Sequence, residues 1–231
     1  MAKKRSKRYQ EAAKMVDSTA VYSIEDAVAL VKKFPAPKFD QTVTLTFRMG
    51  VDPRQSDQMV RGTCPLPHGS GKDVRVLVFA EGDAATEAKN AGAEHVGYEA
   101  LIKEVLGGFM DFDAVIATPA AMAEVRKLGR QLGPRGLMPN PKTGTVTDDT
   151  AGAVKAVKAG RIDFKLDKNG NISAPIGKLS FDESALVENG RAVADSVTAA
   201  RPATAKGIFL LKGALTATMV PGITVDLSDW R

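Results

Sequence analysis

The middle of the chain alternates between short apolar runs and amphipathic segments, and this rhythm restricts the folds open to it. Three runs are typical of strands: DVRVLVFA (73–80), EHVGY (94–98) and DAVIAT (113–118). The segments that follow them are typical of helices: DAATEAKNAGA (83–93), EALIKEVLGG (99–108) and PAAMAEVRKLGRQLG (119–133). Repeats of this kind build parallel strands joined by crossover helices. We therefore predict a three-layer, Rossmann-like α/β domain.

The two ends of the chain follow a different pattern. DQTVTLTFRMGV (40–51) alternates between apolar residues and threonines or Arg48, which predicts a strand with one polar face. RIDFKLDKNGNISAPIGKLSF (161–181) predicts a hairpin that turns at residues 168–171, and residues 206–218 and 222–227 predict two further strands. Residues 23–34, with Ser23 as N-cap, and 182–199 suit helices. These elements are typical of an antiparallel α+β layer.

The order of these patterns predicts the domain organisation. We predict an α/β protein overall, in which an α/β domain (71–158) is inserted into a discontinuous α+β domain (1–70 and 159–231). The Pro- and Gly-rich segment TCPLPHGSGK (63–72) and KAGR (158–161) are the two connections. Two connections restrict relative motion to something like a hinge.

Composition and charge limit the class of protein. The 231 residues are 44% hydrophobic and include no long apolar run, and Cys64 is the single cysteine, so no internal disulfide can form. We therefore predict a soluble protein of the reducing cytoplasm. The net charge is +5 for residues 1–70, −1 for 71–160 and +1 for 161–231. This distribution indicates an anionic partner met mainly by the outer segments, although the N-terminal cluster that includes Lys3, Lys4 and Arg5 also fits a solubilising tail.

RQLGPRGLMPNPKTGTV (130–146) raises the alternative of a nucleotide-hydrolysing, P-loop-like enzyme. Within it, GLMPNPKT lies one residue from the pattern G-x-x-x-x-G-K-[ST], but Pro141 replaces the second glycine and has no N–H for a phosphate. The segment also follows a predicted helix, whereas a P-loop links a strand to a helix. GSGK (69–72) precedes a strand, and only Gly82 follows the first parallel strand.

Catalytic and metal sites have little support in the sequence. Cys64 and His68 are four residues apart, but the only other histidine is His95, so a zinc site with nitrogen and sulfur ligands cannot be completed. Acidic pairs such as Asp148 and Asp149 lack a partner base or nucleophile and read as solvated surface. We predict no catalytic residue, no metal and no cofactor.

A second feature of the same region is its charge. Residues 125–147 hold five cations and no acid: Arg126, Lys127, Arg130, Arg135 and Lys142. One interpretation is a helix end, where cations favour the negative end of the dipole, followed by a solvated loop. The other is a stiff loop that meets RNA phosphates or a neighbouring protein.

Four long motifs, in order, resemble a known family: FDQTV (39–43), VDPRQSDQMVRGTCPLPHGSGK (51–72), MDFDAVIATP (110–119) and LGRQLGPRGLMPNPKTGTV (128–146). The chain resembles, nearly from end to end, the bacterial large-subunit ribosomal protein family L-one. In that family the N- and C-terminal segments form one RNA-binding domain and the middle is an inserted α/β domain.

The resemblance implies a structural function on the cytoplasmic ribosome. Members bind stalk ribosomal RNA beside the tRNA exit site and help deacylated tRNA leave. They also repress translation of their own operon by binding a similar structure in the messenger RNA. We therefore expect ribosomal RNA, exit-site tRNA and the operon mRNA as partners, no membrane, and a monomer when free.

Carried over by motif, the resemblance implies an RNA surface of fourteen residues: Glu25, Lys38, Phe39, Asp40, Thr42, Arg54, Arg61, Arg161, Lys165, Lys168, Lys178, Thr216, Thr218 and Met219. Cations of such a set position phosphates, hydroxyls reach 2′-hydroxyl groups, and Phe39 or Met219 offers apolar contact across a shallow groove.

Two positions depart from the family pattern. Val220 stands where the family usually has the glycine of Thr-Met-Gly-Pro, and that glycine permits close backbone approach to RNA. Ser173 stands where a histidine is expected. These departures bear on the local fit to RNA.

Overall fold

The computed structural model describes residues 5–17 and 19–230 and divides the chain into two compact units. Unit 1 comprises Met1–Gly71 and Ile162–Arg231, and unit 2 comprises Lys72–Arg161. The second boundary lies three residues later than the one expected from sequence, because Ala159, Gly160 and Arg161 belong to unit 2. Lys3 and Lys4 of the basic N-terminal cluster lie outside the described residues.

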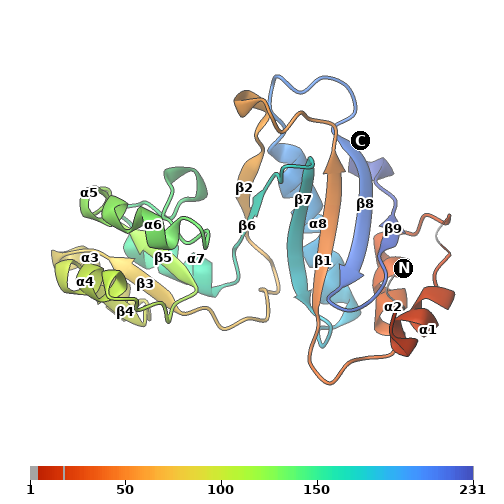
Figure 1. Cartoon of the computed structure of the whole chain (residues 1–231), viewed down its shortest axis with the longest axis horizontal. Coiled ribbons are helices and arrows are strands. Elements are labelled where there is room, and N and C mark those ends of the chain that lie inside the picture. The colour runs from red at the N-terminus through yellow and green to blue at the C-terminus, as the bar shows by residue number, and fades with distance from the viewer. Residues whose placement is uncertain (1–4, 18, 231) are drawn as a thin grey trace. The chain divides into compact units, whose positions relative to one another are not determined.

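Unit 1 is built on a four-stranded antiparallel sheet in the order β7-β1-β8-β9. Its strands are β1 (Thr42–Met49), β7 (Asn171–Lys178), β8 (Leu210–Ala217) and β9 (Ile223–Val225). The helices α2 (Ile24–Lys32) and α8 (Glu183–Ala199) pack on one face, and α8 lies behind the strands in Figure 1. Among the described residues of unit 1, no helix covers the other face. A short helix, α1 (Lys7–Lys14), precedes them.

Alternation along β1 separates the two faces of this sheet. Val43, Leu45, Phe47 and Met49 are buried in the core beneath the helices, whereas Arg48 is exposed and the threonines are half-buried. The strand predicted from the period-two pattern is thus confirmed. The capped helix is confirmed too, because the Ser23 hydroxyl accepts a hydrogen bond of 3.0 Å from the Asp26 N–H at the start of α2.

The predicted hairpin at 161–181 is present at its turn, but β6 (Ile162–Lys165) itself pairs with β2 (Arg61–Cys64) in a separate two-stranded sheet. The chain just after β6 joins β7 through the antiparallel bridge between Leu166 and Ile172 and the bond from the Asp167 N–H to the Asn171 carbonyl. The tight turn between them is present, and the Asp167 carboxylate holds it by accepting bonds from the N–H groups of Asn169 and Asn171. Two short 3₁₀ segments, Ser56–Gln58 and Ser228–Trp230, complete unit 1.

Unit 2 is a three-layer α/β fold, as the strand and helix rhythm predicted. Its parallel strands, in the order β4-β3-β5, are β3 (Val76–Phe79), β4 (His95–Gly97) and β5 (Ala114–Ala117). One face packs against α3 (Gly82–Asn90) and α7 (Thr150–Lys158). The other packs against α4 (Glu99–Leu106), α5 (Met122–Val125), the 3₁₀ segment Arg126–Leu128 and α6 (Gly129–Leu132).

Sequence analysis assigned one helix to residues 119–133 and none to 150–158. The first region is divided into α5, a 3₁₀ turn and α6, and the second forms α7, capped by the Asp149 carboxylate on the Gly152 N–H at 2.8 Å. A further 3₁₀ turn, Pro141–Thr143, lies in the loop between α6 and α7. In the described parts of the chain, no helix is both long and apolar enough to cross a membrane.

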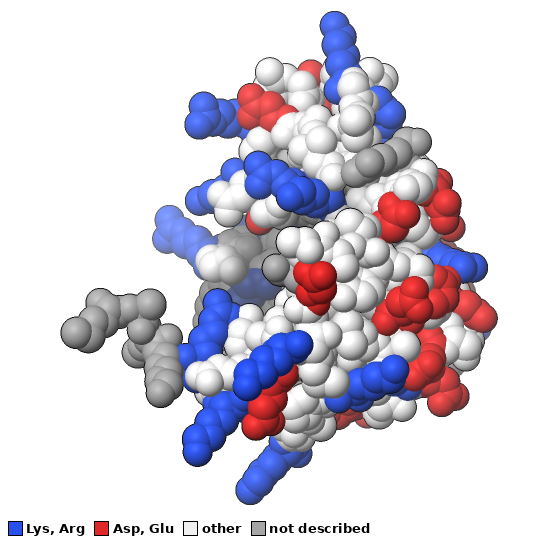
Figure 2. Space-filling view, turned by 90° about the vertical axis from the view of Figure 1, so that its right-hand side faces the viewer, with Lys and Arg blue, Asp and Glu red and all other residues white. Residues whose placement is uncertain are grey.

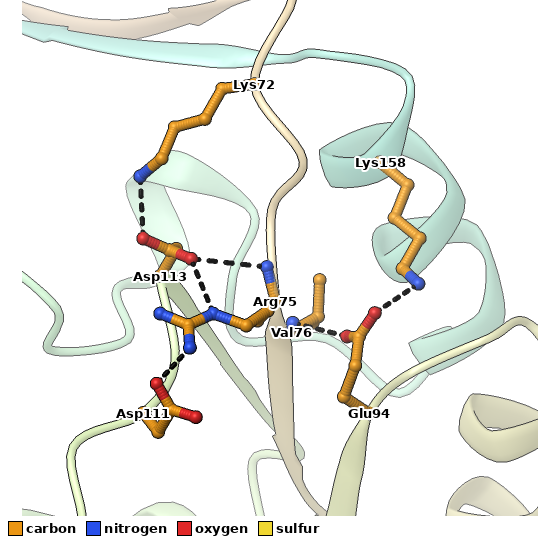
Figure 3. Close-up of polar contacts among 7 residues, drawn as sticks. All are labelled: Lys72, Arg75, Val76, Glu94, Asp111, Asp113 and Lys158. Carbon is orange, nitrogen blue, oxygen red and sulfur yellow. Dashed lines mark hydrogen bonds and ion pairs between the residues drawn. The ribbon is translucent and has the colours of Figure 1, made fainter.

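Two carboxylates flank the start of β3 and hold the ends of unit 2 (Figure 3). Asp113 accepts bonds from Lys72 Nζ at 2.6 Å and from Arg75 Nε at 3.2 Å. Glu94 accepts bonds from Lys158 Nζ and from the Val76 N–H, each at 2.7 Å. Lys72 begins unit 2 and Lys158 ends α7, so each connection is attached to unit 2 by its lysine.

Candidate nucleic-acid interface

The uncovered face of the unit 1 sheet is polar. Thr44 lies opposite Thr216 of β8, and Thr46 lies opposite Ser173 of β7, with 3.0 Å between the two hydroxyl oxygens. In the view of Figure 2, Lys and Arg gather toward the left edge and Asp and Glu toward the right. The left edge corresponds to the front of Figure 1, toward which the uncovered face turns. A hydroxyl-lined sheet with cations at its margin suits RNA sugars and phosphates.

Three of the predicted residues meet at one end of this face. The Thr42 N–H donates to Thr218 Oγ1 at 3.2 Å, and that hydroxyl donates to the Thr42 carbonyl at 3.4 Å. Lys178 Nζ donates to Thr42 Oγ1 at 3.1 Å. Thr42 and Lys178 are register partners, so the pairing of β1 with β7 and β8 brings together residues from three distant segments. We call this group, Thr42, Lys178 and Thr218, the threonine cluster.

The chain next to the threonine cluster is held by Gln41, which sequence analysis did not single out, and by Asp40, which it did. Gln41 is only 1% exposed, and its Oε1 accepts a bond of 3.0 Å from the Met219 N–H while its carbonyl accepts one from Leu179. Asp40 accepts bonds from the Ser180 N–H at 3.2 Å and hydroxyl at 2.7 Å. These side-chain hydrogen bonds, of which the one to Gln41 is part-buried and those to Asp40 are exposed, fix the loops that present Phe39 and Met219.

Phe39 and Met219 remain about half exposed, at 48% and 50%. Because large apolar side chains are normally buried, two of them on one rim are available to pack against a partner. Lys38 is also exposed. Thr216 also lies on the open face. Its hydroxyl donates a hydrogen bond of 3.0 Å to the carbonyl of the next residue, Ala217.

Four further predicted cations lie on other parts of unit 1. Arg61 and Lys165 are direct cross-strand partners in the β2–β6 pair, an arrangement that repulsion between like charges disfavours unless an anion lies between them. Lys168 lies in the turn that Asp167 holds, and the N–H groups of Asn171 and Asn169 keep the pKa of that carboxyl below its ordinary value. Arg54 follows β1 in an exposed turn, where its N–H donates to Asp52.

Glu25 and Arg161 each bond to a residue of their own unit outside the threonine cluster. Glu25 forms an ion pair of 2.5 Å with Arg191 of α8. Its own N–H, and then that arginine, keep the pKa of the Glu25 carboxyl low. Arg161 belongs to unit 2, where its Nη2 donates to the Thr143 carbonyl at 2.9 Å. Both side chains therefore have structural partners within their own unit.

The place where a doubly wound fold would bind a nucleotide is acidic in unit 2. Such ligands bind beyond the carboxyl ends of the parallel strands, which here lead into Glu81 after β3 and Tyr98 after β4. Burial raises the pKa of the Tyr98 hydroxyl, and the charges of Glu124, Glu81 and Glu99 raise it further. The three carboxylates disfavour a phosphate at this edge of the sheet, where Lys127 supplies the one positive charge that acts on Tyr98.

The cysteine and histidine considered as ligands are engaged separately. The Cys64 thiol is buried and lies 3.4 Å from the Ala192 carbonyl, and burial raises its pKa. His68 pairs with Glu188 at 2.6 Å. Over residues 5–17 and 19–230 there is no group of three or more His, Cys, Asp or Glu arranged to hold a metal ion.

Comparison with known proteins places this geometry in a family. The family model described as "Ribosomal protein L1p/L10e family" matches residues 31–221. The chain belongs to the L1p/L10e family. Three similar proteins each carry the name large ribosomal subunit protein uL1. That of Bifidobacterium longum subsp. infantis is 60% identical over 223 residues, 96% of this chain and 97% of the relative. That of Bifidobacterium adolescentis is 55% identical over 222 residues, 96% of each. That of Beutenbergia cavernae is 54% identical over 226 residues, 98% of this chain and 95% of the relative.

Membership of the L1p/L10e family confirms the resemblance seen in the motifs and excludes the alternative of a nucleotide-hydrolysing enzyme, because these relatives are structural ribosomal proteins. The matched range contains thirteen of the fourteen predicted RNA contacts. Glu25 precedes it.

Val220, at the position where the resemblance led us to expect glycine, points inward. Val220 is 8% exposed and belongs to the hydrophobic core of unit 1. No residue other than glycine has a positive φ among those described, so Val220 adopts an ordinary backbone conformation. The extra side chain therefore fills the core beneath the Thr218–Met219 segment and leaves its outer surface open.

Proposed function

We propose that unit 1 binds the stalk region of large-subunit ribosomal RNA with the threonine cluster and the rim around it. Lys178 and Lys38 would meet phosphates, and the hydroxyls of Thr42, Thr216 and Thr218 would reach sugar 2′-hydroxyl groups. Phe39 and Met219 would cover an apolar part of the RNA. Arg54, Arg61, Lys165 and Lys168 would extend the contact along the backbone.

The observation that carries this proposal is the meeting of a cation and two hydroxyls from β1, β7 and the end of β8, beside two exposed apolar side chains. Buried Gln41 supports the site from below, so its geometry is set before RNA arrives. A site fixed in advance loses little conformational entropy on binding, which favours affinity and specificity. Asp40, whose carboxylate is occupied by Ser180, would act by holding this rim.

Through this RNA the protein would take part in translation in the cytoplasm, on the ribosome. We infer that it assists release of deacylated tRNA from the exit site and represses its own operon by binding a similar structure in the messenger. For such regulation to work, ribosomal RNA and the messenger must compete for the same site on the protein. We expect the unbound protein to be a monomer.

Titration of a labelled stalk RNA fragment by fluorescence anisotropy tests the site. Thr218→Ala should weaken binding by about 1–3 kcal/mol without changing the salt dependence, because the hydroxyl carries no charge. Thr218→Ser, which keeps the hydroxyl, should retain most of the affinity. Lys178→Gln should lower the slope of log affinity against log salt by about one unit, whereas Lys33→Gln, an exposed cation at the end of α2, should not.

Unchanged affinity for stalk RNA in both Thr218→Ala and Lys178→Gln would move the site away from the threonine cluster. The finer roles need their own assays. Large subunits rebuilt without the protein should release deacylated tRNA from the exit site more slowly than complete ones. A reporter preceded by the operon leader should be repressed by the protein and relieved by added stalk RNA. Equal release rates, or a reporter that does not respond, would remove the corresponding role.

A further inference from the structure

The first connection, TCPLPHGSGK (63–72), passes directly beside the lysine of the threonine cluster. Gly71 is the last residue of unit 1, and a Cβ built on it would lie 2.9 Å from Lys178 Cγ and 2.8 Å from Phe181 Cε1. Non-bonded carbon atoms prefer about 3.5–4.0 Å, so a side chain does not fit at this position without displacing a neighbour. The bare backbone of Gly71 therefore lies against the aliphatic stem of Lys178.

Backbone conformation is a separate requirement for glycine at this position. Gly71 has a φ of 67°, in the left-handed region that favours glycine. Gly207, also in unit 1, has a φ of 78°, but a Cβ built there would meet no atom within 4 Å. The two glycines share the backbone requirement, and Gly71 adds to it the close approach of a lysine stem. A comparison of the two positions thus separates the contact from the strain.

The segments on both sides of this contact are anchored. In the connection, the His68 N–H donates to the side chain of Asn189 in α8, which itself donates to the Gly69 carbonyl, both at 3.1 Å. Just after β7, the Leu179 N–H donates to the Gln41 carbonyl at 2.8 Å. Because neither segment can shift without breaking these bonds, a side chain at position 71 would displace the lysine stem instead.

We propose that Gly71 is a positioning residue for RNA binding, which acts by leaving the space in which the Lys178 stem is held with its ammonium group toward the RNA. Gly71 itself touches no RNA in this proposal. The inference rests on the proposed function, in which Lys178 meets a phosphate. It adds to that function a residue outside the threonine cluster, in the chain that leads into unit 2.

The contact orders the lysine before RNA arrives. An unsupported lysine side chain samples many rotamers, and binding must fix one of them. The stem lies against Gly71 and the ammonium donates to Thr42 Oγ1 at 3.1 Å, so less rotamer entropy is lost on binding. A methyl group at position 71 would push the stem aside and turn the ammonium away from its phosphate. The next residue, Lys72, bonds to Asp113 within unit 2, so this contact lies where the chain leaves unit 1.

The test titrates labelled stalk RNA against the full-length protein. Gly71→Ala should weaken binding about 5- to 10-fold and lower the slope of log affinity against log salt by up to about one unit, as Lys178→Gln does, because one phosphate contact is lost. The matched control is Gly207→Ala, which forces the same left-handed conformation on an alanine in unit 1 without a steric contact. It should change the affinity by less than about twofold and leave the salt slope unchanged.

A double-mutant cycle shows whether Gly71 acts through the lysine. In the Lys178→Gln background, Gly71→Ala should change the affinity by less than about twofold, because the side chain that it displaces no longer carries a charge. A general structural role of Gly71 would instead weaken binding equally in both backgrounds and would leave the salt slope of the single variant unchanged. The cycle therefore distinguishes a positioning residue from one that only maintains the fold.

Phe181→Leu serves as a second variant if Gly71→Ala does not fold, since it introduces no backbone strain. Leucine lacks the Cε1 and Cζ atoms that face Gly71, so the connection can move off the lysine stem, and binding should weaken about twofold or more unless Lys178 is already replaced.

Equal losses of affinity in Gly71→Ala and Gly207→Ala, or a loss that persists in the Lys178→Gln background, would overturn the inference. So would unchanged binding in whichever of Gly71→Ala and Phe181→Leu folds. The proposed function survives these results as long as Lys178→Gln and Thr218→Ala still weaken binding. If Lys178→Gln alone leaves binding unchanged, the positioning role of Gly71 falls together with the place of that lysine in the site.

Discussion

Asn189 offers the sharpest test of how unit 1 is held together. Its side chain is fully buried in α8 and bonds to two other segments of the chain. Nδ2 donates to the Ile176 carbonyl at 2.7 Å and to the Gly69 carbonyl at 3.1 Å, and Oδ1 accepts from the His68 N–H at 3.1 Å. One amide thus joins α8 to β7 and to the connection that leads into unit 2.

We expect Asn189→Ala to lower the free energy of unfolding of unit 1 by about 2–4 kcal/mol. The bond to Ile176 is buried, so its loss leaves a carbonyl without a partner at a cost of about 1–3 kcal/mol. The bonds to His68 and Gly69 are only partly buried, and water can replace them, so each adds about 0.5 kcal/mol.

Urea unfolding followed by tryptophan fluorescence measures this effect. Trp230 is the only tryptophan and lies in unit 1, where its indole donates to Asp195 at 2.7 Å, so the signal reports that unit alone. The control is Glu188→Ala, which removes the exposed pair with His68 and should cost less than about 1 kcal/mol. A loss below about 1 kcal/mol in Asn189→Ala would refute the reasoning, since the three bonds would then contribute no more than a surface pair.

Three further predictions concern both units. Bonds from Lys72 and Arg75 keep the pKa of Asp113 below its ordinary value, so its stabilising effect exists above pH 4–5 and disappears as the pH falls through the lowered pKa. The protection factors of the β3 amides, which correct for the intrinsic pH dependence of exchange, should therefore fall on acidification in the native protein and depend less on pH in Asp113→Asn. Val220→Gly should lower the free energy of unfolding of unit 1 by about 2–4 kcal/mol in urea, because a core side chain is lost and glycine makes the unfolded chain more flexible. The folded variant should keep its affinity for stalk RNA within about twofold. A tighter complex would show that valine hinders RNA binding. Replacing residues 73–157 by a short glycine linker should weaken stalk RNA binding by less than a hundredfold, or about 2.7 kcal/mol. The reason is that the core of unit 1 shares no residue with the cores of unit 2. A greater loss of affinity in a folded protein would place the main site on unit 2.

Local periodicity was sufficient to predict the elements whose burial follows a regular period. β1 alternates over eight residues, and β3 and β5 of unit 2 are continuous apolar runs, so these strands were recognisable without knowledge of their partners. β6 was recognisable as a strand but its partner was not. Residues 61–64 read RGTC, with no alternation to identify them as β2, so the nearer strand β7 was chosen instead.

The candidate site, too, could be predicted only in part from the sequence. The resemblance in the motifs indicated Thr42, Lys178 and Thr218, and the register of β1 brings them into contact. Gln41 and Asn189 were not predicted, because a polar residue in sequence reads as exposed by default. Only the folded unit shows that their amides are buried and bonded to backbone groups of distant segments.

The position of β1 between β7 and β8 sets an order for folding during synthesis. Thr42 emerges from the ribosome 136 residues before Lys178 and 176 residues before Thr218, its partners in the sheet. Unit 2 is one continuous stretch and can fold meanwhile, drawing together the two ends of chain that flank it and shortening the loop that β1 must close. Until β8 is made, β1 keeps an unpaired edge that favours aggregation. A chain that stops short of residue 218 therefore lacks the complete threonine cluster, and under the proposed function it would hold the RNA less tightly than a finished copy.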